Sequence, residues 1–158
     1  MDAHTARPAS VLVGPQRALL TDVLDRLIPP AGSLPAAGAL GVADYIDRVL
    51  AGSTDLWRTI LEVLLQIDAT AGREHSRVFS ELEGSRKDAV LRRVETAEPE
   101  GFQALLRQAY NGYYSDPTVI TSLGLEARPP QPAGYELEAG DLSPLEKVKR
   151  RGRMYREV

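Results

Sequence analysis

A chain of 158 residues with 43% hydrophobic content is long enough for one domain with a real core and too short to promise two. Its formal net charge of -3 provides no global attraction to nucleic acid or to anionic lipid. The chain has no cysteine, which excludes disulfides, a thiolate nucleophile and iron–sulfur ligation, and no run approaches the roughly 20 apolar residues of a membrane span. We therefore expect no nucleic-acid partner and no direct insertion into a membrane.

The N-terminal stretch is rich in alanine, threonine and proline and shows no periodicity, so we expect residues 1–14 to form a flexible arm. Its apolar patch, Val11 to Val13, is far shorter than the roughly 7 to 15 apolar residues of a signal peptide. The chain as written is therefore expected in the cytoplasm. A periplasmic location would require a partner that carries the export signal.

Beyond this arm, apolar residues recur at the i, i+3, i+4, i+7 spacing that is typical of amphipathic helices. A first helix is predicted to begin near Pro15 and to end at Pro29, the first of two successive prolines. A loop of small residues, 31–41, leads to a second helix that begins near Val42 and ends at Gly52.

Three further helices are predicted. The third is capped by Ser53 or Thr54, has the richest apolar run and is expected to be the most buried. Gly84 breaks the chain after it, Ser85 and Asp88 resemble a capping box for the fourth, and Pro99 opens the fifth. The residues predicted to line the core are Leu19, Leu20, Val23, Leu24, Leu27, Ile28, Val42, Ile46, Val49, Leu50, Trp57, Ile60, Leu61, Leu64, Leu65, Ile67, Phe79, Leu82, Leu91, Val94, Phe102, Leu105, Leu106, Ala109 and Tyr110.

The stretch from Gly112 onward is punctuated by glycine and proline, which rules out one long helix or a central strand. Asp116 followed by Pro117 is an N-cap followed by a first-turn proline, so a short helix is predicted there, and Gly124 stands where a left-handed residue would end it. Tyr113 and Tyr114 precede this helix. Adjacent residues on an irregular segment usually point apart, so at most one of them needs to cap the core.

The remainder of the chain is predicted to be extended or unfolded without a partner. Residues 125–142 are predicted to form an extended Pro- and Gly-rich strap, in which residues 128–134 run as polyproline II with unpaired backbone polar groups, free to lie along another surface. Residues 143–158 carry a net charge of +4, against -7 for residues 1–142, and form a basic tail that is either solvated or docked on a partner. The predicted fold is thus all-α: a single irregular bundle of about five helices over residues 15–124, with a Pro-rich strap and a basic tail.

Catalytic chemistry is poorly represented. His75 stands beside Glu74, but neighbours on a helix point to different faces, so we interpret His75 as a solvated surface residue. The phosphate-binding, dinucleotide-binding, calcium-binding and zinc-protease motifs are all missing. The aspartates of the first two helices are interpreted as ordinary solvated side chains; they are Asp22, Asp25, Asp44 and Asp47.

Several segments together resemble the gluconate 2-dehydrogenase subunit 3 family, the small subunit of membrane-associated flavin sugar dehydrogenases. They are LLTDVLDRLIPP, GVADYIDRVLAG, GYYSDPTVITSLG and RPPQPAGYEL, and the ending KVKRRGRMYR is similar to the family's basic, aromatic close. The YYSDP and PPQPxGY pieces are the most specific of them. The resemblance covers about residues 18–155, although residues 53–100 match only in helical pattern and in Phe79 with Leu82.

This resemblance implies a noncatalytic small subunit that binds and stabilises an FAD-containing catalytic subunit of the glucose-methanol-choline oxidoreductase type. FAD is expected in that partner and no cofactor in this chain; a cytochrome c subunit is a further candidate partner. Many family members begin with a twin-arginine export signal, which this chain as written lacks. Three alternatives follow: the complex works in the cytoplasm, the partner carries the signal, or the start of the gene is missing. The residues predicted to bind the partner are Tyr113, Tyr114, Asp116, Pro117, Arg128, Pro129, Pro130, Pro132, Tyr135, Arg150, Arg151, Arg153, Met154 and Tyr155.

The alternative is a self-standing helical enzyme or regulator whose site the sequence does not reveal. In that case the isolated chain would be active or would bind its ligand alone. An accessory subunit would instead require co-expression with a flavoprotein.

Overall fold

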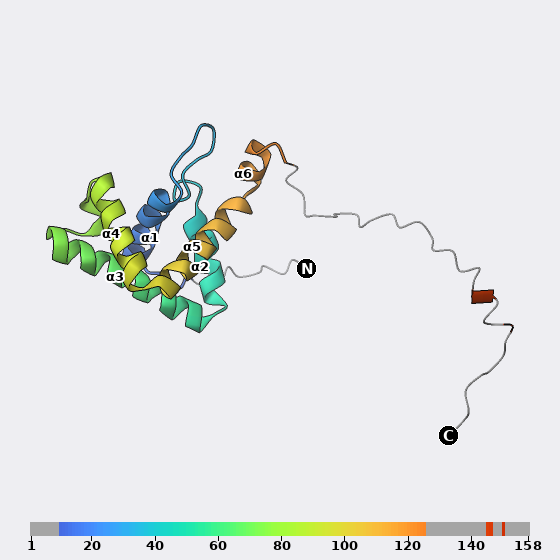
Figure 1. Ribbon diagram of the computed structural model, residues 1–158, viewed down its shortest axis with the longest axis horizontal. Helices are drawn as coiled ribbons and strands as arrows, with labels where there is room; N and C mark the ends of the chain where they lie inside the picture. The colour runs from blue at the N-terminus through green and yellow to red at the C-terminus, as the bar shows by residue number, and fades with distance from the viewer. Residues whose placement is uncertain (1–9, 126–144, 147–149, 151–158) are drawn as a thin grey trace, which may run out of the picture. The chain divides into compact units, whose positions relative to one another are not determined.

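The computed structural model describes residues 10–125, 145–146 and 150. Within them the chain is all-α, as predicted, with six α-helices, one short 3₁₀ helix and a single isolated β-bridge between Ala31 and Leu34 (Figure 1). The elements are α1 (Gly14–Leu27), α2 (Val42–Ala51), α3 (Thr54–His75), η1 (Phe79–Glu81), α4 (Gly84–Ala97), α5 (Pro99–Tyr114) and α6 (Pro117–Ser122).

The chain divides into two compact units, residues 1–127 and 128–158. All seven elements belong to the first unit. In the second, the described residues are Leu145 and Glu146, which are helical, and Arg150, whose backbone N–H donates to the carbonyl of Glu146 at 3.2 Å. The predicted strap and the rest of the predicted tail lie outside the described residues.

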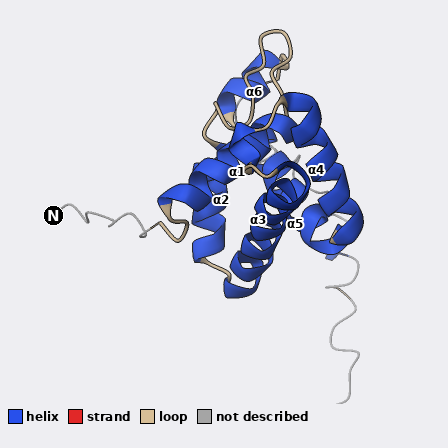
Figure 2. Cartoon of the chain, turned by 90° about the vertical axis from the view of Figure 1, so that its left-hand side faces the viewer, coloured by secondary structure: helices blue, strands red, loops and turns tan. Residues whose placement is uncertain are grey.

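The core is organised around α3, the longest helix, which packs against α1, α2, α4 and α5 (Figure 2). Its inward face carries Ile60, Val63, Leu64 and Ile67, and each of these side chains is almost completely buried. The prediction that the third helix is the central one is therefore consistent with its contacts. Leu65 was wrongly placed in the core, because 66% of its surface is exposed.

Helix α5 runs further than the sequence suggested. It continues through Gly112 to Tyr114, so the buried stripe of α5 extends by one turn and ends at Tyr113, which is 2% exposed. The predicted core residue Tyr110 lies outside this stripe and is 43% exposed. The sequence placed the end of α5 too early because Gly112 was interpreted as the end of regular structure.

Gly112 instead allows α5 to approach α2 closely. A Cβ at this position would lie 2.7 Å from Cδ1 of Tyr45 and 2.8 Å from Cγ1 of Val42, distances that side chains do not tolerate without movement. Glycine is therefore present for helix packing, although it lowers helix propensity. No turn is needed to explain it.

The aspartates of α1 and α2 join separate elements, so their interpretation as ordinary solvated side chains was wrong. Asp47 is 8% exposed, and its Oδ1 accepts the N–H groups of Val11 and Leu12 at 3.0 and 2.9 Å. Asp25 accepts the N–H of Gly38 at 2.8 Å, which holds the loop between α1 and α2. Three of these aspartates also form ion pairs: Arg17 with Asp44, Arg17 with Asp47 and Lys87 with Asp22.

The contact with Asp47 also corrects the predicted N-terminal arm. Leu12 is 4% exposed and belongs to the core, and the indole N–H of Trp57 donates to the carbonyl of Val11 at 3.4 Å. Residues 10–13 are therefore part of the helical domain. Residues 1–9 lie outside the described part of the chain.

Helix ends were predicted with mixed success. The hydroxyl of Ser53 accepts the N–H of Leu56 at 3.3 Å, and Gly124 adopts a left-handed φ of 76°, both as predicted. The predicted capping box of α4 is wrong: the helix begins at Gly84 after Glu83, without a side-chain cap. Asp88 pairs instead with Arg26 of α1, through three hydrogen bonds of 2.6 to 2.9 Å.

Candidate partner-binding surface

Tyr113 is buried where α5 meets the loop between α1 and α2. Its hydroxyl donates a hydrogen bond of 2.8 Å to the carbonyl oxygen of Pro35, which lies 78 residues earlier in the chain. Burial raises the pKa of the Tyr113 hydroxyl, and the neighbouring Tyr114 adds to this effect. The sequence placed Tyr113 among the partner-binding anchors. In the structure, this residue instead fixes the surface that Tyr114 presents.

Tyr114 is the exposed member of this pair of tyrosines. It is 53% exposed, and its ring contacts Tyr113 edge-on, with the two ring centroids 5.2 Å apart. Tyr110, which is 43% exposed, is a second neighbour of this ring, with the two centroids 6.1 Å apart. Edge-on and tilted aromatic pairs are favourable, so the buried Tyr113 supports an exposed aromatic surface.

The short helix α6 continues this surface. Oδ1 of Asp116 accepts the N–H of Thr118 at 2.8 Å, and Pro117 occupies the first helical position, so the predicted start of α6 is confirmed. Val119 is fully buried and anchors the helix on the core. Two leucines then follow on the outside: Leu123 is 48% exposed and Leu125 is 62% exposed.

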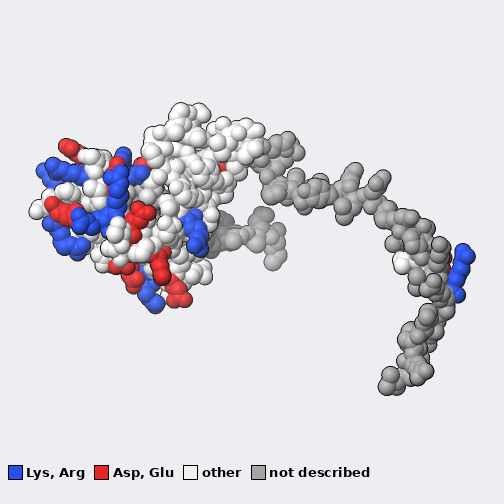
Figure 3. All heavy atoms as spheres, in the orientation of Figure 1, with Lys and Arg blue, Asp and Glu red and all other residues white. Residues whose placement is uncertain are grey.

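These residues form one end of the domain that is almost free of charge, which we call the uncharged end. It consists of the exposed residues of loop 29–35 and of residues 110–125, and Asp116 is the single charged residue in these two ranges. Figures 1 and 2 both place the loop beside α6, in agreement with the bond from Tyr113 to Pro35. Figure 3 shows this end as white, whereas Lys, Arg, Asp and Glu gather over the rest of the visible face.

A shallow cavity of about 320 Å³ adjoins the uncharged end. It lies where the start of α2 faces the junction of α5 and α6, and Tyr45, Gly112 and Pro117 are among its lining residues. Its charged lining residues are Asp44, Arg48 and Asp116. Residues of the uncharged end and charged residues of α2 therefore line this cavity together.

The remaining predicted partner-binding residues are placed as follows. Arg150 is exposed. The others, which lie outside the described residues, are Arg128, Pro129, Pro130, Pro132, Tyr135, Arg151, Arg153, Met154 and Tyr155. Their roles stay predictions.

The sequence reasoning missed the contribution of Tyr110, Leu123 and Leu125 to the exposed apolar surface. Tyr110 was assigned to the core, and the two leucines were given no role. A signal was available: residues 29–41 contain no charged residue, and residues 117–125 contain none either. Each of these uncharged segments lies beside a helix end, and the structure brings the two together.

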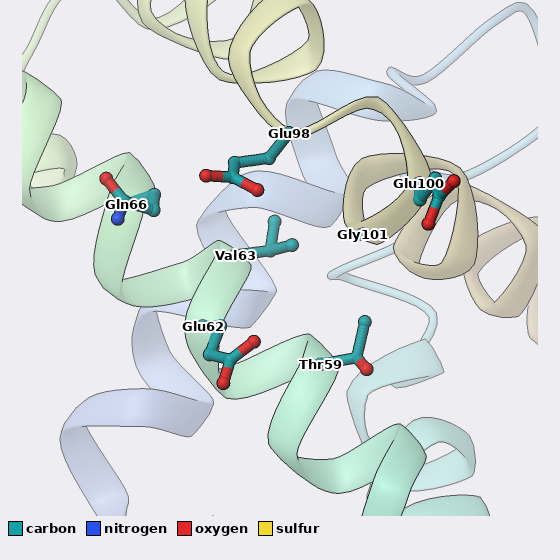
Figure 4. Close-up of a pocket in the computed structure, with 7 residues that line it drawn as sticks. All are labelled: Thr59, Glu62, Val63, Gln66, Glu98, Glu100 and Gly101. Carbon is teal, nitrogen blue, oxygen red and sulfur yellow. The ribbon is translucent and has the colours of Figure 1, made fainter.

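A further cavity is a natural place to test the alternative function, an enzyme. It has a volume of about 630 Å³ and lies between α3 and the start of α5 (Figure 4). Its lining residues are Thr59, Glu62, Val63, Gln66, Glu98, Glu100 and Gly101. They supply carboxylates but neither a histidine, a lysine nor a tyrosine to act with them, and the described residues contain no group of three His, Asp or Glu placed to hold a metal.

His75 and Glu74 also do not form a catalytic pair in the structure. Glu74 faces Arg93 of α4, with 3.6 Å between the charged groups. His75, at the end of α3, is half-buried, and its Nε2 has no hydrogen-bond partner among the described residues. The interpretation of His75 as a solvated surface residue is therefore wrong for its Nε2 atom, which is buried.

None of the helices described in the structure is long and apolar enough to cross a membrane. Searches of curated proteins and of solved structures gave no significant match. The family model for gluconate 2-dehydrogenase subunit 3, in contrast, matches residues 15–129, which include every helix from α2 to α6 and nearly all of α1. The chain therefore belongs to the gluconate 2-dehydrogenase subunit 3 family.

Proposed function

We propose that this protein is a noncatalytic accessory subunit that binds and stabilises the FAD-containing catalytic subunit of a sugar or glycoside dehydrogenase. The family is named for a subunit of a dehydrogenase, which supports an accessory role within a complex. The catalytic partner is proposed to be an oxidoreductase of the glucose-methanol-choline type. A cytochrome c subunit is a second candidate partner, and the compartment follows the export signal of the complex.

The observation that carries this proposal is the uncharged end. Tyr110, Tyr114, Leu123 and Leu125 are each between 43% and 62% exposed, although large apolar side chains gain free energy from burial. Contiguous exposed apolar surface of this kind marks interaction sites in soluble proteins. Aromatic side chains are also enriched among the residues that dominate binding energy at interfaces.

The backbone beneath the uncharged end is held in place by the core, which favours binding by this surface. Tyr113 is held by its bond to Pro35, Val119 is fully buried, and Asp116 caps α6. The exposed rings and leucines therefore project from fixed backbone. A preorganised surface loses less conformational entropy when it binds.

The test is co-expression with a candidate partner, a glucose-methanol-choline oxidoreductase from the same genome, with the complex recovered through a tag on the oxidoreductase. Tyr114→Glu combined with Leu123→Glu places two charges in the uncharged end and should reduce recovery of the complex at least tenfold. Both side chains are about half exposed, so the helical circular dichroism of the free subunit should be unchanged. The matched control is Thr96→Glu with Gln103→Glu, two exposed positions on α4 and α5.

Two results would contradict the proposal. One is a failure of the wild-type chain to co-purify with the oxidoreductase or to raise its yield of flavin-loaded protein. The other is saturable micromolar binding of FAD by the isolated chain, measured by flavin fluorescence and calorimetry. That second result would favour the self-standing enzyme.

A further inference from the structure

The loop between α1 and α2 ends in an exposed tip of small, uncharged residues. Residues 29–33, which we call the loop tip, have the sequence PPAGS, and all five are exposed. The loop extends beyond the ends of the two helices that it joins (Figure 1). Gly32, at the turn, has no atom within 4 Å of the position that a Cβ would occupy. The loop tip is therefore a convex element surrounded by open space.

The loop tip has a defined conformation although it is exposed. The N–H of Ala31 donates to the carbonyl of Leu34 at 3.0 Å, and the N–H of Leu34 donates to the carbonyl of Ala31 at 2.9 Å. Gly32, the first of the two central residues, has a φ of 59°, as in a type II′ hairpin turn. Pro29 and Pro30 have φ fixed by their rings. The loop tip therefore has little conformational entropy left to lose when it binds.

The base of the loop is tied to the core. The N–H of Ala37 donates to the carbonyl of Ile28 at 3.1 Å, and Ala37 is completely buried. Oδ1 of Asp25 accepts the N–H groups of Gly38 and Ala39 at 2.8 and 3.2 Å. These bonds close the loop at its base, so the exposed tip projects from fixed backbone.

The loop is also tied to the aromatic part of the uncharged end. The hydroxyl of Tyr113 donates to the carbonyl of Pro35 at 2.8 Å, and the ring of Tyr113 contacts that of Tyr114. Figures 1 and 2 both place the loop beside α6. A specific interface buries roughly 800 Å² on each partner, far more than one tyrosine ring offers. The protein that covers Tyr114 is therefore expected to reach the loop tip as well, and the proposed function assigns that position to the catalytic subunit.

A second copy of this chain fits the loop tip less well. Two copies that met through their uncharged ends would each present a projecting loop. The cavity that adjoins this end is lined by Asp44, Arg48 and Asp116, and an uncharged tip placed there would remove water from these charged groups without pairing them. The structure therefore favours the catalytic subunit as the occupant.

We infer that the loop tip inserts into a recess of the catalytic subunit, lined by uncharged side chains and adjacent to the surface that covers Tyr114. A narrow convex element is buried on all its sides only by a concave partner, and the core of an interface is packed as closely as a protein interior. Small side chains let the partner approach the backbone of the tip. This inference rests on the proposed function and deepens it, because it gives the shape and polarity of the partner's site.

The first experiment enlarges the loop tip in the tagged, co-expressed complex. Ser33→Trp adds a bulky side chain that a fitted recess cannot accept, and it should reduce recovery of the complex about tenfold or more. Ser33→Ala, which is smaller, should keep wild-type recovery. The matched control is Ser85→Trp, an exposed serine on α4 that should also leave recovery unchanged. Circular dichroism of the free variants checks that the helical domain is folded.

A second measurement does not depend on a bulky substitution. The chain has no cysteine, so Ser33→Cys introduces a single thiol into this polypeptide. Its alkylation by N-ethylmaleimide, followed by the mass of this subunit, should be about tenfold slower or more in the complex than in the free subunit, because buried thiols are inaccessible. Ser85→Cys, the matched control, should react at the same rate in both.

The outcomes separate this inference from the proposed function. Equal alkylation of Ser33→Cys in the free subunit and in an intact complex would overturn the inference and leave the proposed function in place. Slow alkylation together with full recovery of Ser33→Trp would show a flat contact, which also overturns the recess. Slow alkylation in the free subunit that disappears on dilution would identify a second copy as the occupant instead. Failure of the wild-type complex to form would remove both the inference and the proposed function.

Discussion

The paired tyrosines at the end of α5 have opposite roles although they are adjacent. Tyr113 faces the core and bonds to Pro35, whereas Tyr114 faces solvent. Because Tyr113 is buried, the deprotonated form of its hydroxyl is disfavoured and its pKa is raised above 10. The unfolded chain, in which the hydroxyl is hydrated, therefore loses this proton at lower pH than the folded chain.

Above about pH 10 the unfolded state binds fewer protons than the folded state at Tyr113, so the free energy of unfolding falls as pH rises through this range. Tyr113→Phe should cost about 0.5 to 1.5 kcal/mol at neutral pH through the lost hydrogen bond, and should remove this alkaline decrease.

Urea unfolding of wild type and variant at pH 8 and pH 10.5 measures both effects. Tyr110→Phe is the control, because it is exposed and keeps the alkaline decrease. An equal alkaline loss of stability in wild type and Tyr113→Phe would show that other groups cause it.

Single residues were the hardest to assign from the sequence. The pattern around Asp47 is that of a polar residue on a helix, and only the fold shows that its carboxylate receives the N–H groups of Val11 and Leu12. The two tyrosines likewise have the same chemistry, and their different exposure follows from the helical phase of α5. A local pattern carries no information about such long-range partners.

At the scale of elements, two helical glycines, Gly112 and Gly72, have different surroundings. Gly112 lies where α5 contacts α2, and a methyl group there would meet Tyr45 and Val42. Gly72 of α3 is exposed and has no atom within 4 Å of the position that a Cβ would occupy. The two positions therefore form a matched pair.

Gly112→Ala should lower the free energy of unfolding by about 1 to 3 kcal/mol, because overpacking outweighs the gain in helix propensity. Gly72→Ala should raise it by about 0.5 to 1 kcal/mol, because it gains propensity without a clash. Chemical denaturation of both variants tests the pair. Stabilisation of similar size by both substitutions would show that α5 and α2 are not closely packed at Gly112.

Elements were predictable wherever the signal was local. Asp116 followed by Pro117 marks the start of α6, and Gly124 marks its end, because capping and left-handed backbone depend on single residues. The end of α5 was not predictable in this way. Gly112 could equally have ended the helix, and only the close approach to α2 shows that it does not.

At the scale of the whole molecule, charge is unevenly distributed along the chain. Residues 143–158 carry +4 and residues 1–142 carry -7. The buried hydrophobic residues described in the structure all lie between Leu12 and Val119. Folding of the helical domain and binding by the basic segment should therefore be separable.

Deleting residues 143–158 should leave the helical circular dichroism and the melting temperature of the helical domain unchanged. It should weaken the complex with the catalytic subunit and flatten the salt dependence of its dissociation, since exposed ionic contacts are screened by salt and apolar contacts are not. Affinity measurements from about 50 to 500 mM salt test this, because the Debye length, the range over which exposed charges interact, shortens across this interval. Unchanged affinity and salt response would show that this segment does not bind.

The fold class, the number of main helices and the family were accessible from the sequence, because apolar periodicity and the YYSDP segment are properties of contiguous residues. The uncharged end was not, because it unites loop 29–35 with residues 110–125. Surfaces made from distant segments become visible only once the helices are placed.

The uncharged end has a consequence for how much of this subunit a cell should make. Charge on a surface keeps copies apart, and this end has only Asp116 to do so. Under the proposed function, copies produced in excess of the catalytic subunit would meet through their uncharged ends, and such association rises with concentration. The proposed function therefore implies balanced synthesis of the two polypeptides, because one end of this small helical domain carries so little charge.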